Sequence, residues 1–432
     1  MMRKGECSIR YVRDINDGKS KLYTLLLILL PVLKQYVFLS MSFMDVFNIF
    51  AFVYFFVNRG NLNVRNIFVP YILYTLIFMM FAMLNLSVYS PSLIFKNILS
   101  FTLLTFNMFF IAPYYFDLEY GFKWYKNVVL ISGILSIIQT LINALFSYRL
   151  ILVFPWLTLN YGDRISGSSF INAVQGYYSY RASAFFLEAA YFAEFCLPFL
   201  FLSLFNVDSK LTTKNIVRSL FVTLAICLSA SMLGIVGCLI AWIFYLCKLL
   251  WTSKRRKLIV LIPLVVGFGI YIYNLDIVQM QVMSKMHSTE DLARTSSLSL
   301  RLLRGWYCFG QLDSFHQIVG VGYSCVGAFF TEYNITTVVD AKGLANSYMN
   351  GISLMFCSLG IFGTLLYLVP FIKIILQSGK VFMLSICWIV LMFTAQIFDT
   401  ACYVVLVVFI IQISKEKHDN GCIVDCSIDN IS

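Results

Sequence analysis

The sequence predicts an all-α polytopic membrane protein with about twelve transmembrane helices. Two observations predict this class. The 432 residues are 60% hydrophobic and only 12% charged, whereas a soluble globular domain is about 45–50% apolar and 25% charged. The apolar residues, which include 41 Phe and 26 Tyr, gather in runs long enough to cross a bilayer. This composition excludes a disordered chain, a disulfide-stapled miniprotein and an ordinary soluble enzyme.

A helix that crosses the hydrocarbon core needs about 20 mostly apolar residues. Such runs predict spans at 22–41, 43–57, 67–86, 93–116, 124–146, 185–206, 216–231, 233–250, 258–275, 344–371, 381–397 and 399–413. Three stretches, 22–57, 216–250 and 381–413, are too long for one crossing, so each is split into two spans. Strands are not expected in these runs, because they lack a period of two and exceed the roughly 10 residues of a barrel strand.

Lys and Arg in the short connections predict the orientation. If segment 1–21 is cytoplasmic, most of the 32 basic residues fall on the cytoplasmic side. An even number of spans then returns the tail, 414–432, to the cytoplasm. Segment 1–21 is too long and polar for a cleavable signal peptide. The basic run 254–257 reads better as a topology anchor than as a lipid-headgroup site.

Two segments on the predicted outer side are too long to be simple turns. They run over 147–184 and 276–343, and they divide the spans into groups at 22–146, 185–275 and 344–413. Long connections are usually functional or disordered. The second is rich in aromatic residues, so we expect it to fold back over the outer face of the bundle.

The net charge of +11 does not predict nucleic-acid binding, because the basic residues are spread between apolar runs and form no basic face. Most of the 12 Cys lie inside apolar runs, where Cys behaves as a small hydrophobe. No metal-ligand spacing appears and no cofactor is predicted. Cys422 and Cys426 lie in a polar tail that is more typical of disorder than of a metal site.

Arg181 and Glu188 are the first candidate site residues. If the run 181–194 is helical, the two positions lie two turns apart on nearly the same face. Glu188 would then lie deeper than Arg181 at the outer mouth of the bundle. A buried Glu stays charged only when it is paired. The pair is either part of a site or a structural ion pair that anchors the helix.

Arg294, Arg301 and Arg304 form a second candidate cluster, in the long outer segment. Their spacings of seven and three place them on one broad face of a helix. Glu290 and Asp291 can pair with Arg294, which leaves the other two without evident local partners. Planar guanidinium groups suit phosphate oxygens. We therefore infer a phosphate-bearing ligand on the outer side, against the alternative of a solvated basic face.

Further along lie a GxG turn at Gly320–Gly322 and an Asn346 that opens a Gly-rich span. Asn346 either hydrogen-bonds a sugar or caps the helix. His316 is the only sensible general base among the three His, although a solvated loop His is the simpler reading.

Charged residues near span ends have simple explanations. Snorkelling accounts for Lys34, Asp45 and Lys96. Asp399 is read as a cap of the last span in preference to a functional residue, which is the alternative.

Three local patterns together resemble the Wzy-type O-antigen polymerases and the related O-antigen ligases. They are an Arg followed seven residues later by a Glu at a span start (Arg181, Glu188), an Arg-containing outer segment that leads to GxG (Arg301, Gly320–Gly322), and an Asn at the lip of the next span before a Gly-rich stretch (Asn346, Gly360–Gly363). The order and topology match over about 185–370. The chain departs from the family pattern at Ala189-Ala190, where Pro-Ser is common, and at Ala345, where ligases and some polymerases carry His.

The resemblance implies a GT-C-like glycosyltransferase of the bacterial inner membrane. Its donor would be a growing glycan on undecaprenyl diphosphate, its acceptor a single repeat unit on the same lipid, and a chain-length regulator a possible partner. Arginines would stabilise the departing diphosphate. We expect Arg181 and Arg301 to contact the diphosphate, with Glu188 orienting Arg181 or serving as base. The expected supporting contacts are Arg304, Arg164, Arg294, Tyr177, Tyr180, Tyr323 and Asn346.

Three other functions remain open. An O-antigen ligase is disfavoured by Ala345 in place of His. A lipid-linked oligosaccharide flippase or other transporter predicts charged residues along a path through the bundle, and mid-span charges are scarce. A membrane scaffold or receptor leaves the arginine pattern unexplained.

Overall fold

The fold is known from a computed structural model of the chain. It describes residues 17–38, 41–59, 68–84, 89–148, 157–159, 181–186, 188–205, 213–251, 303–335, 349–377 and 379–428, together with the single residues 150, 152 and 154.

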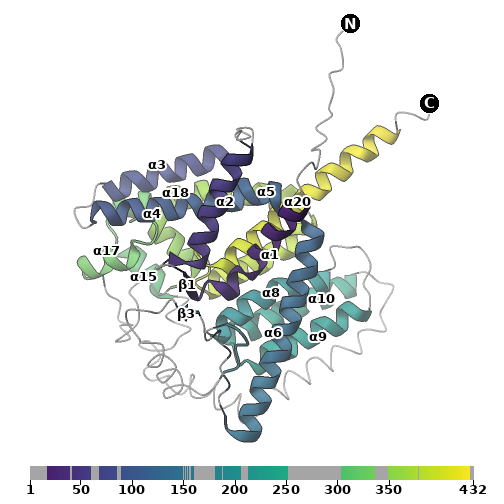
Figure 1. The fold of residues 1–432 in the computed structure, drawn as a ribbon. Coiled ribbons are helices and arrows are strands. Elements are labelled where there is room, and N and C mark those ends of the chain that lie inside the picture. The colour runs from purple at the N-terminus through teal and green to yellow at the C-terminus, as the bar shows by residue number, and fades with distance from the viewer. Residues whose placement is uncertain are drawn as a thin grey trace.

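Helices make up nearly all of the described structure (Figure 1). The first half of the chain forms α1 (Asp17–Leu33), α2 (Phe43–Arg59), α3 (Phe68–Leu84), α4 (Pro91–Phe106), the π-helical turn η1 (Asn107–Ile111), α5 (Ala112–Tyr115) and α6 (Leu118–Phe146). The second half forms α8 (Ala189–Phe205), α9 (Thr213–Leu228), α10 (Met232–Trp251), α15 (Gly305–Gly310), α16 (Ser314–Val319), α17 (Val326–Glu332), α18 (Gly351–Gln377), α19 (Gly379–Thr394) and α20 (Ala401–Ile428).

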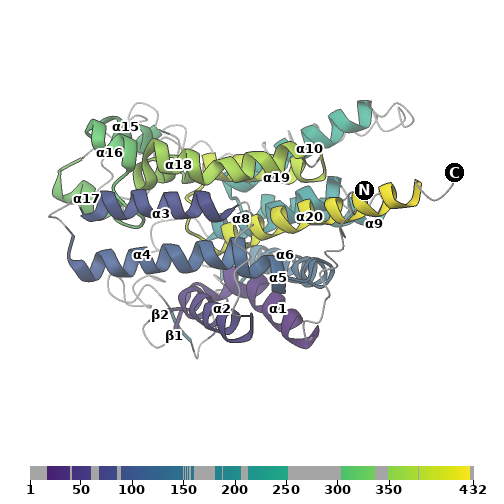
Figure 2. The ribbon, with the colours of Figure 1, turned by 90° about the horizontal axis from the view of Figure 1, so that it is seen from above.

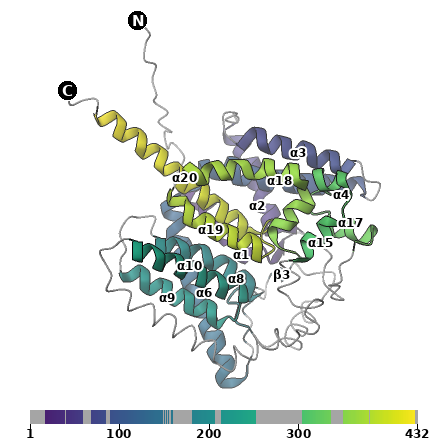
Figure 3. The ribbon, with the colours of Figure 1, turned by 180° about the vertical axis from the view of Figure 1, so that it is seen from behind.

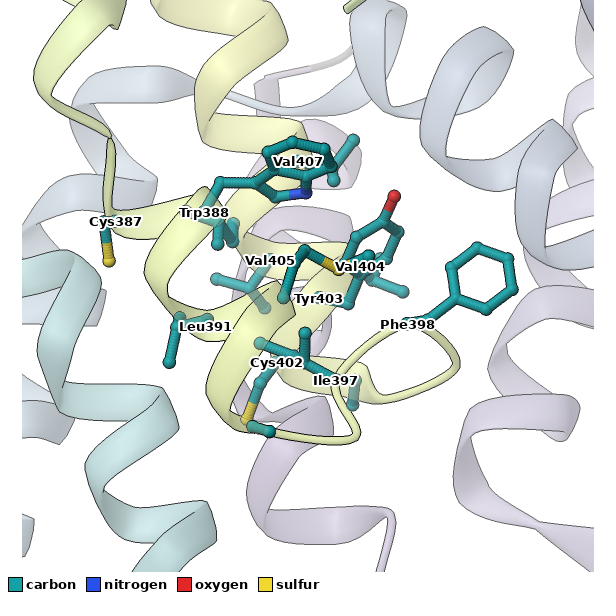
Figure 4. Close-up of a cluster of buried hydrophobic side chains, with 14 of the residues drawn as sticks. Cys387, Trp388, Leu391, Ile397, Phe398, Cys402, Tyr403, Val404, Val405 and Val407 are labelled. Atoms are coloured by element: carbon teal, nitrogen blue, oxygen red, sulfur yellow. The ribbon is translucent and has the colours of Figure 1, made fainter. Parts of the chain in front are cut away.

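The long helices form two groups with a third set between them. Helices α6, α8, α9 and α10 pack together on one side, and α2, α3, α4 and α18 on the other. Between the groups lie α1, α19 and α20, as Figure 3 shows from behind. Figure 4 shows the apolar packing at the α19–α20 corner, where Leu391, Ile397 and Val404 are completely or almost completely buried.

Burial separates central helices from peripheral ones. Residues 192–204 of α8 and 401–413 of α20 are all buried, and a helix that is apolar on every side belongs in the interior. The outward faces of peripheral helices instead expose large apolar side chains, such as Phe50, Ile77, Phe81, Ile134 and Ile243. Exposed apolar surface of this extent is typical of a lipid-facing protein.

Three helical segments are long and apolar enough to cross a membrane, namely 91–115, 118–146 and 351–376. Six shorter apolar helices accompany them within the described residues. The prediction of a helical, apolar architecture is therefore confirmed, and the structure indicates a multi-pass membrane protein.

The three long apolar stretches are each divided as predicted. The breaks fall between α1 and α2, between α9 and α10, and between α19 and α20. Three bounds differ clearly from the expected ones. Helix α1 ends at Leu33 and does not reach 41, and α18 begins at Gly351 rather than at 344. Helix α20 continues to Ile428, well past the expected end at 413, so the tail around Cys422 and Cys426 is helical there and not disordered as expected. The predicted span at 258–275 lies outside the described residues.

A small sheet was not predicted from the sequence. Strands β1 (Tyr36–Phe38), β2 (Met41–Ser42) and β3 (Thr158–Leu159) pair antiparallel in the order β2-β1-β3, with Val37 opposite Ser42 and Tyr36 opposite Leu159. Strand β1 and the start of β2 lie inside the run predicted as a helical span at 22–41, so the expectation that these runs contain no strands is wrong at that point. The sheet ties the 147–184 segment to the end of α1.

The described part of the second long segment packs against the bundle, as expected. Helices α15 and α16 contact α18, and α16 also contacts α3. Figure 2 shows α15, α16 and α17 gathered at one end of the molecule, while the last turns of α20 leave at the other.

The GxG turn is locked to a break in α18. Gly360 interrupts that helix with φ 67° and ψ −178°, which frees two backbone carbonyl groups. Val321 N–H donates to the Cys357 carbonyl and Gly322 N–H to the Ser358 carbonyl, both at 2.9 Å. Freed backbone groups at this depth need such partners. The GxG turn at Gly320–Gly322 and the break at Gly360 therefore contact each other directly.

Two buried polar contacts between helices are made by neutral side chains around Asn107. Asn107 in η1 accepts a hydrogen bond from the Tyr23 hydroxyl at 2.6 Å and donates one to Asn48 Oδ1 at 2.7 Å. Such bonds hold helices together in an apolar medium.

Candidate functional site

Hydrogen bonds bring several distant segments to one end of the bundle, which we call the polar end. Gln35 Nε2–H, just after α1, donates to the Phe185 carbonyl at 2.6 Å. The neighbouring Lys34 Nζ donates to the Asp399 carbonyl at 3.4 Å. At the same α19–α20 corner, the Ala395 carbonyl accepts from the N–H of Gly351 at 2.7 Å. The polar end therefore contains the 181–186 segment, the end of α1, the α19–α20 corner and the start of α18.

The opposite end of the bundle carries the first residues of α1 and the exit of α20. Ser20 of α1 donates to the Tyr115 carbonyl, and Gln412 of α20 donates to the Ala112 carbonyl. Helices α1 and α20 thus run between the two ends in opposite directions.

The predicted helix through 181–194 is wrong for its first half. Helix α8 begins only at Ala189, residues 181–186 are not helical, and Ala184 has φ 51°. Arg181 and Glu188 therefore do not share a helix face. Glu188 is exposed, and its carbonyl accepts the first bond of α8 from Phe192 N–H at 3.2 Å. A carboxylate at this position interacts favourably with the helix dipole. Because Glu188 is exposed and Arg181 is half-buried, Glu188 is not the deeper member of the pair.

Gln139, on α6, explains why this segment turns. Its Oε1 accepts hydrogen bonds from the N–H groups of Ser183 and Ala184 at 3.1 and 2.7 Å, and Gln35 holds the next carbonyl. These bonds satisfy buried backbone groups that a helix would satisfy internally. Two glutamines from different helices thus set the backbone next to Arg181, which is half-buried.

Replacing Gln139 with leucine should lower the free energy of unfolding by about 3 kcal/mol, because two backbone donors would lose their acceptor. Thr140→Val is the matched control: that hydroxyl donates only to the Ser136 carbonyl of its own helix, and its loss should cost less than about 1 kcal/mol. Thermal unfolding of the purified protein in detergent measures both. Equal unfolding midpoints for the two variants would contradict the role of Gln139.

Arg304 lies at the start of α15 and is 4% exposed. The helix approaches α18 so closely that a Cβ at Gly305 would collide with the Ser353 side chain. Since Asn350 and Ser353 form the first turn of α18, Arg304 lies at the same end as the α18 start. A guanidinium is seldom buried without a specific purpose.

Asn350 caps α18. The Asn350 Oδ1 accepts from Ser353 N–H at 2.8 Å, as an N-cap residue does. Asn346 itself lies outside the described residues. So do five other predicted site residues: Arg164, Tyr177, Tyr180, Arg294 and Arg301.

Tyr323 is the best-placed of the predicted sugar contacts. It follows the GxG turn, is 6% exposed, and packs its ring on Phe101 and Phe398 at centroid distances of 5.0 and 6.2 Å. Burial, followed by the nearby charges of Asp399 and Asp45, raises the pKa of its hydroxyl well above the usual value. The hydroxyl is therefore a permanent hydrogen-bond donor.

Lys34, Asp45 and Asp399 meet at the polar end, which the sequence analysis missed. Lys34 touches the Asp399 backbone, and both aspartates lie near Tyr323. Glu194, 3% exposed on α8, and Lys34 both lie close to the thiol of Cys402. The sequence did carry a signal for this meeting. In the predicted topology, the last residues of the span at 22–41 and the first residues of the spans at 43–57 and 399–413 lie on the same side of the membrane.

Asp45 and Asp399 differ in their local roles. Asp45 takes part in capping α2: its N–H donates to Ser42 Oγ at 3.2 Å, and the Ser42 hydroxyl donates to Asp45 Oδ2 at 2.6 Å. Asp399 does not cap α20, contrary to the prediction, because Thr400 does. The Thr400 Oγ1 accepts from Tyr403 N–H at 3.3 Å.

The simpler reading of His316 as a solvated loop residue is wrong. Its side chain is 12% exposed, lies between the rings of Phe315 and Phe329, and contacts the Asp313 carboxylate through Nδ1. His316 is thus part of the packing of α16 against α17. Within the part of the chain that the structure describes, no three His, Cys, Asp or Glu residues form a metal-binding group.

No protein-family model matches the sequence, and a search of curated proteins returns no significant match. The fold and the site alone therefore define the class of this protein. It is a multi-pass helical membrane protein in which arginines, carboxylates and a buried tyrosine gather at one end of the bundle.

Proposed function

We propose that the protein is a polysaccharide polymerase of the O-antigen type. It would join oligosaccharide repeat units that are carried on undecaprenyl diphosphate, at the periplasmic face of a bacterial inner membrane. Both termini would be cytoplasmic. No cofactor is needed in this proposal, because the lipid diphosphate is itself the leaving group.

One observation carries the proposal: Arg181 and Arg304 belong to segments that meet at the same end of an apolar bundle, beside carboxylates and Tyr323. A polyprenyl chain dissolves in the bilayer, its diphosphate lies at the surface, and the glycan projects outward. Arginines at that level suit the diphosphate oxygens, with which a guanidinium forms two parallel hydrogen bonds. In the proposed site Arg301 and Arg181 contact the diphosphate, and Arg304, Arg164 and Arg294 support them.

The chemistry follows from these groups. A hydroxyl of the acceptor repeat unit attacks the anomeric carbon of the donor glycan, and the bond between that carbon and the phosphate oxygen breaks. The electron pair leaves with the undecaprenyl diphosphate, and the hydroxyl proton passes to a base. Guanidinium groups aimed at the departing oxygens stabilise the charge as it develops.

Two alternatives are less well supported. A flippase needs polar or charged groups along a path through the bundle, whereas the buried interhelical contacts around Asn107 are neutral. An O-antigen ligase is the sister reaction, with a lipid A-core acceptor, and Ala345 stands where that family carries His.

Deletion of the gene, followed by a gel of the surface polysaccharide, tests the proposal. We expect the ladder of long chains to disappear while one repeat unit remains attached. A ladder that survives deletion contradicts the polymerase. Loss of every repeat unit would instead favour the ligase or the flippase.

A further inference from the structure

The α19–α20 corner packs beside α18. Phe398 in the corner contacts Tyr367, which lies beyond the Gly360 break in α18, with ring centroids 5.8 Å apart. Helices α3, α4 and α18 extend past this level (Figure 2), and α15 to α17 pack against that extension. The corner thus lies further along the bundle than α15 to α17, and we call residues 395–400 the floor of the polar end.

Asp399 occupies this floor with an uncommitted carboxylate. Thr400 performs the helix-capping role, and Lys34 binds the Asp399 main chain, not its side chain. Among the described residues, none donates a hydrogen bond to the carboxylate and no basic group lies within ion-pair distance of it. Asp45 differs, because the Ser42 hydroxyl already binds its carboxylate at 2.6 Å.

Tyr323 supplies an independent sign that a ligand is bound here. More than nine-tenths of the side chain is buried, yet no described residue accepts a hydrogen bond from its hydroxyl. The hydroxyl oxygen is not itself one of the fully buried polar atoms, so it can donate a hydrogen bond to a ligand. The hydroxyl lies near both Asp399 and Asp45, so it faces the same floor. A group that accepts from a neutral phenol and donates to a carboxylate would satisfy both side chains, and a sugar hydroxyl does both.

We propose that Asp399 is the general base that accepts the proton of the attacking sugar hydroxyl, and that the Tyr323 hydroxyl donates a hydrogen bond to the acceptor sugar. This inference rests on the polymerase function proposed above and assigns the base, a role that the sequence motifs left open. In the step, the acceptor O–H bond breaks and its proton moves to an Asp399 oxygen. The new bond joins the acceptor oxygen to the anomeric carbon, and the undecaprenyl diphosphate departs with the electron pair. Protonated Asp399 then releases the proton to water.

The test uses the full-length protein in liposomes with undecaprenyl-diphosphate-linked repeat units extracted from the deletion strain. Asp399→Asn should slow chain extension per folded molecule by about 100- to 10,000-fold, the usual contribution of a general base. Binding of undecaprenyl diphosphate alone should stay within about twofold of wild type, because the arginines are intact. Tyr323→Phe should slow extension by about tenfold, the equivalent of one hydrogen bond.

Asp117→Asn is the matched control, because Asp117 caps α6 at the opposite end of the bundle and Asn caps equally well. It should extend chains at the wild-type rate. An Asp399→Asn protein within threefold of wild type, or one that loses lipid binding in proportion to its activity, overturns the assignment. Should Asp399→Asn not fold, Asp399→Ala decides: restoration of extension by sodium formate supports the base, and no restoration overturns it. Wild-type protein that extends nothing refutes the proposed function itself.

Discussion

Replacement of Arg181 by alanine should abolish long glycan chains and leave single repeat units. The protein should still reach the membrane in normal amounts, because Arg181 lies in a turn that Gln139 and Gln35 hold through backbone bonds. Loss of one preorganised donor to a developing anion typically costs 100- to 1,000-fold in rate. Arg181→Lys should recover only part of the activity, since an ammonium cannot form the paired hydrogen bonds of a guanidinium.

Arg218→Ala provides the control for this result. Arg218 is half-buried like Arg181, but it lies in α9 at the opposite end and donates to its neighbour Asn215 at 3.4 Å. Complementation of the deletion strain, with the polysaccharide gel as readout and a membrane blot for protein amount, compares all three variants. A full ladder from Arg181→Ala, or an equal loss from Arg218→Ala, would remove Arg181 from the site.

Replacement of Gly320 by alanine should destabilise the protein by about 3 kcal/mol or more, through backbone strain and overpacking together. Gly320 has φ 82°, and an added Cβ would lie 2.5 Å from the Gly360 nitrogen. The atoms that this Cβ would meet belong to the backbone of α18, so they cannot move aside as a flexible side chain could. The Val321 and Gly322 bonds to the α18 break should be lost together, and the 320–325 segment that carries Tyr323 would no longer be held in place.

Gly310→Ala is the matched control, because nothing lies within 4 Å of a Cβ at that position. The unfolding midpoint in detergent should fall for Gly320→Ala and stay near wild type for Gly310→Ala. Gly360→Ala should resemble Gly320→Ala, since the same contact is broken from the other side. Equal midpoints for Gly320→Ala and Gly310→Ala would show that the backbone contact contributes little to stability.

Sequence patterns predicted single features correctly but not their connections. The GxG turn and the Gly-rich start of the tenth span were both noticed, and neither pattern indicated that Gly320 touches Gly360. Arg181 was recognised as a site candidate, yet the helical geometry assigned to it was wrong. That geometry depends on Gln139 and Gln35, which lie on other helices and carry no local signal at position 181.

Asp399 shows how a simple local explanation of a residue can be wrong. Asp399 was read as a helix cap, because an Asp at the start of an apolar run usually is one. Thr400 takes that role in the structure, and the aspartate instead faces Tyr323.

The sequence by itself determined that this chain is a bundle of apolar helices, where its long apolar stretches divide, and which outer segments carry arginines. Transfer of a helix into lipid depends on the sum of its own side chains, so it can be read from a local window of residues. Only the tertiary structure decided which polar groups share one end of the bundle at contact distance. Those meetings depend on how helices hundreds of residues apart pack against one another, as Lys34 and Asp399 do.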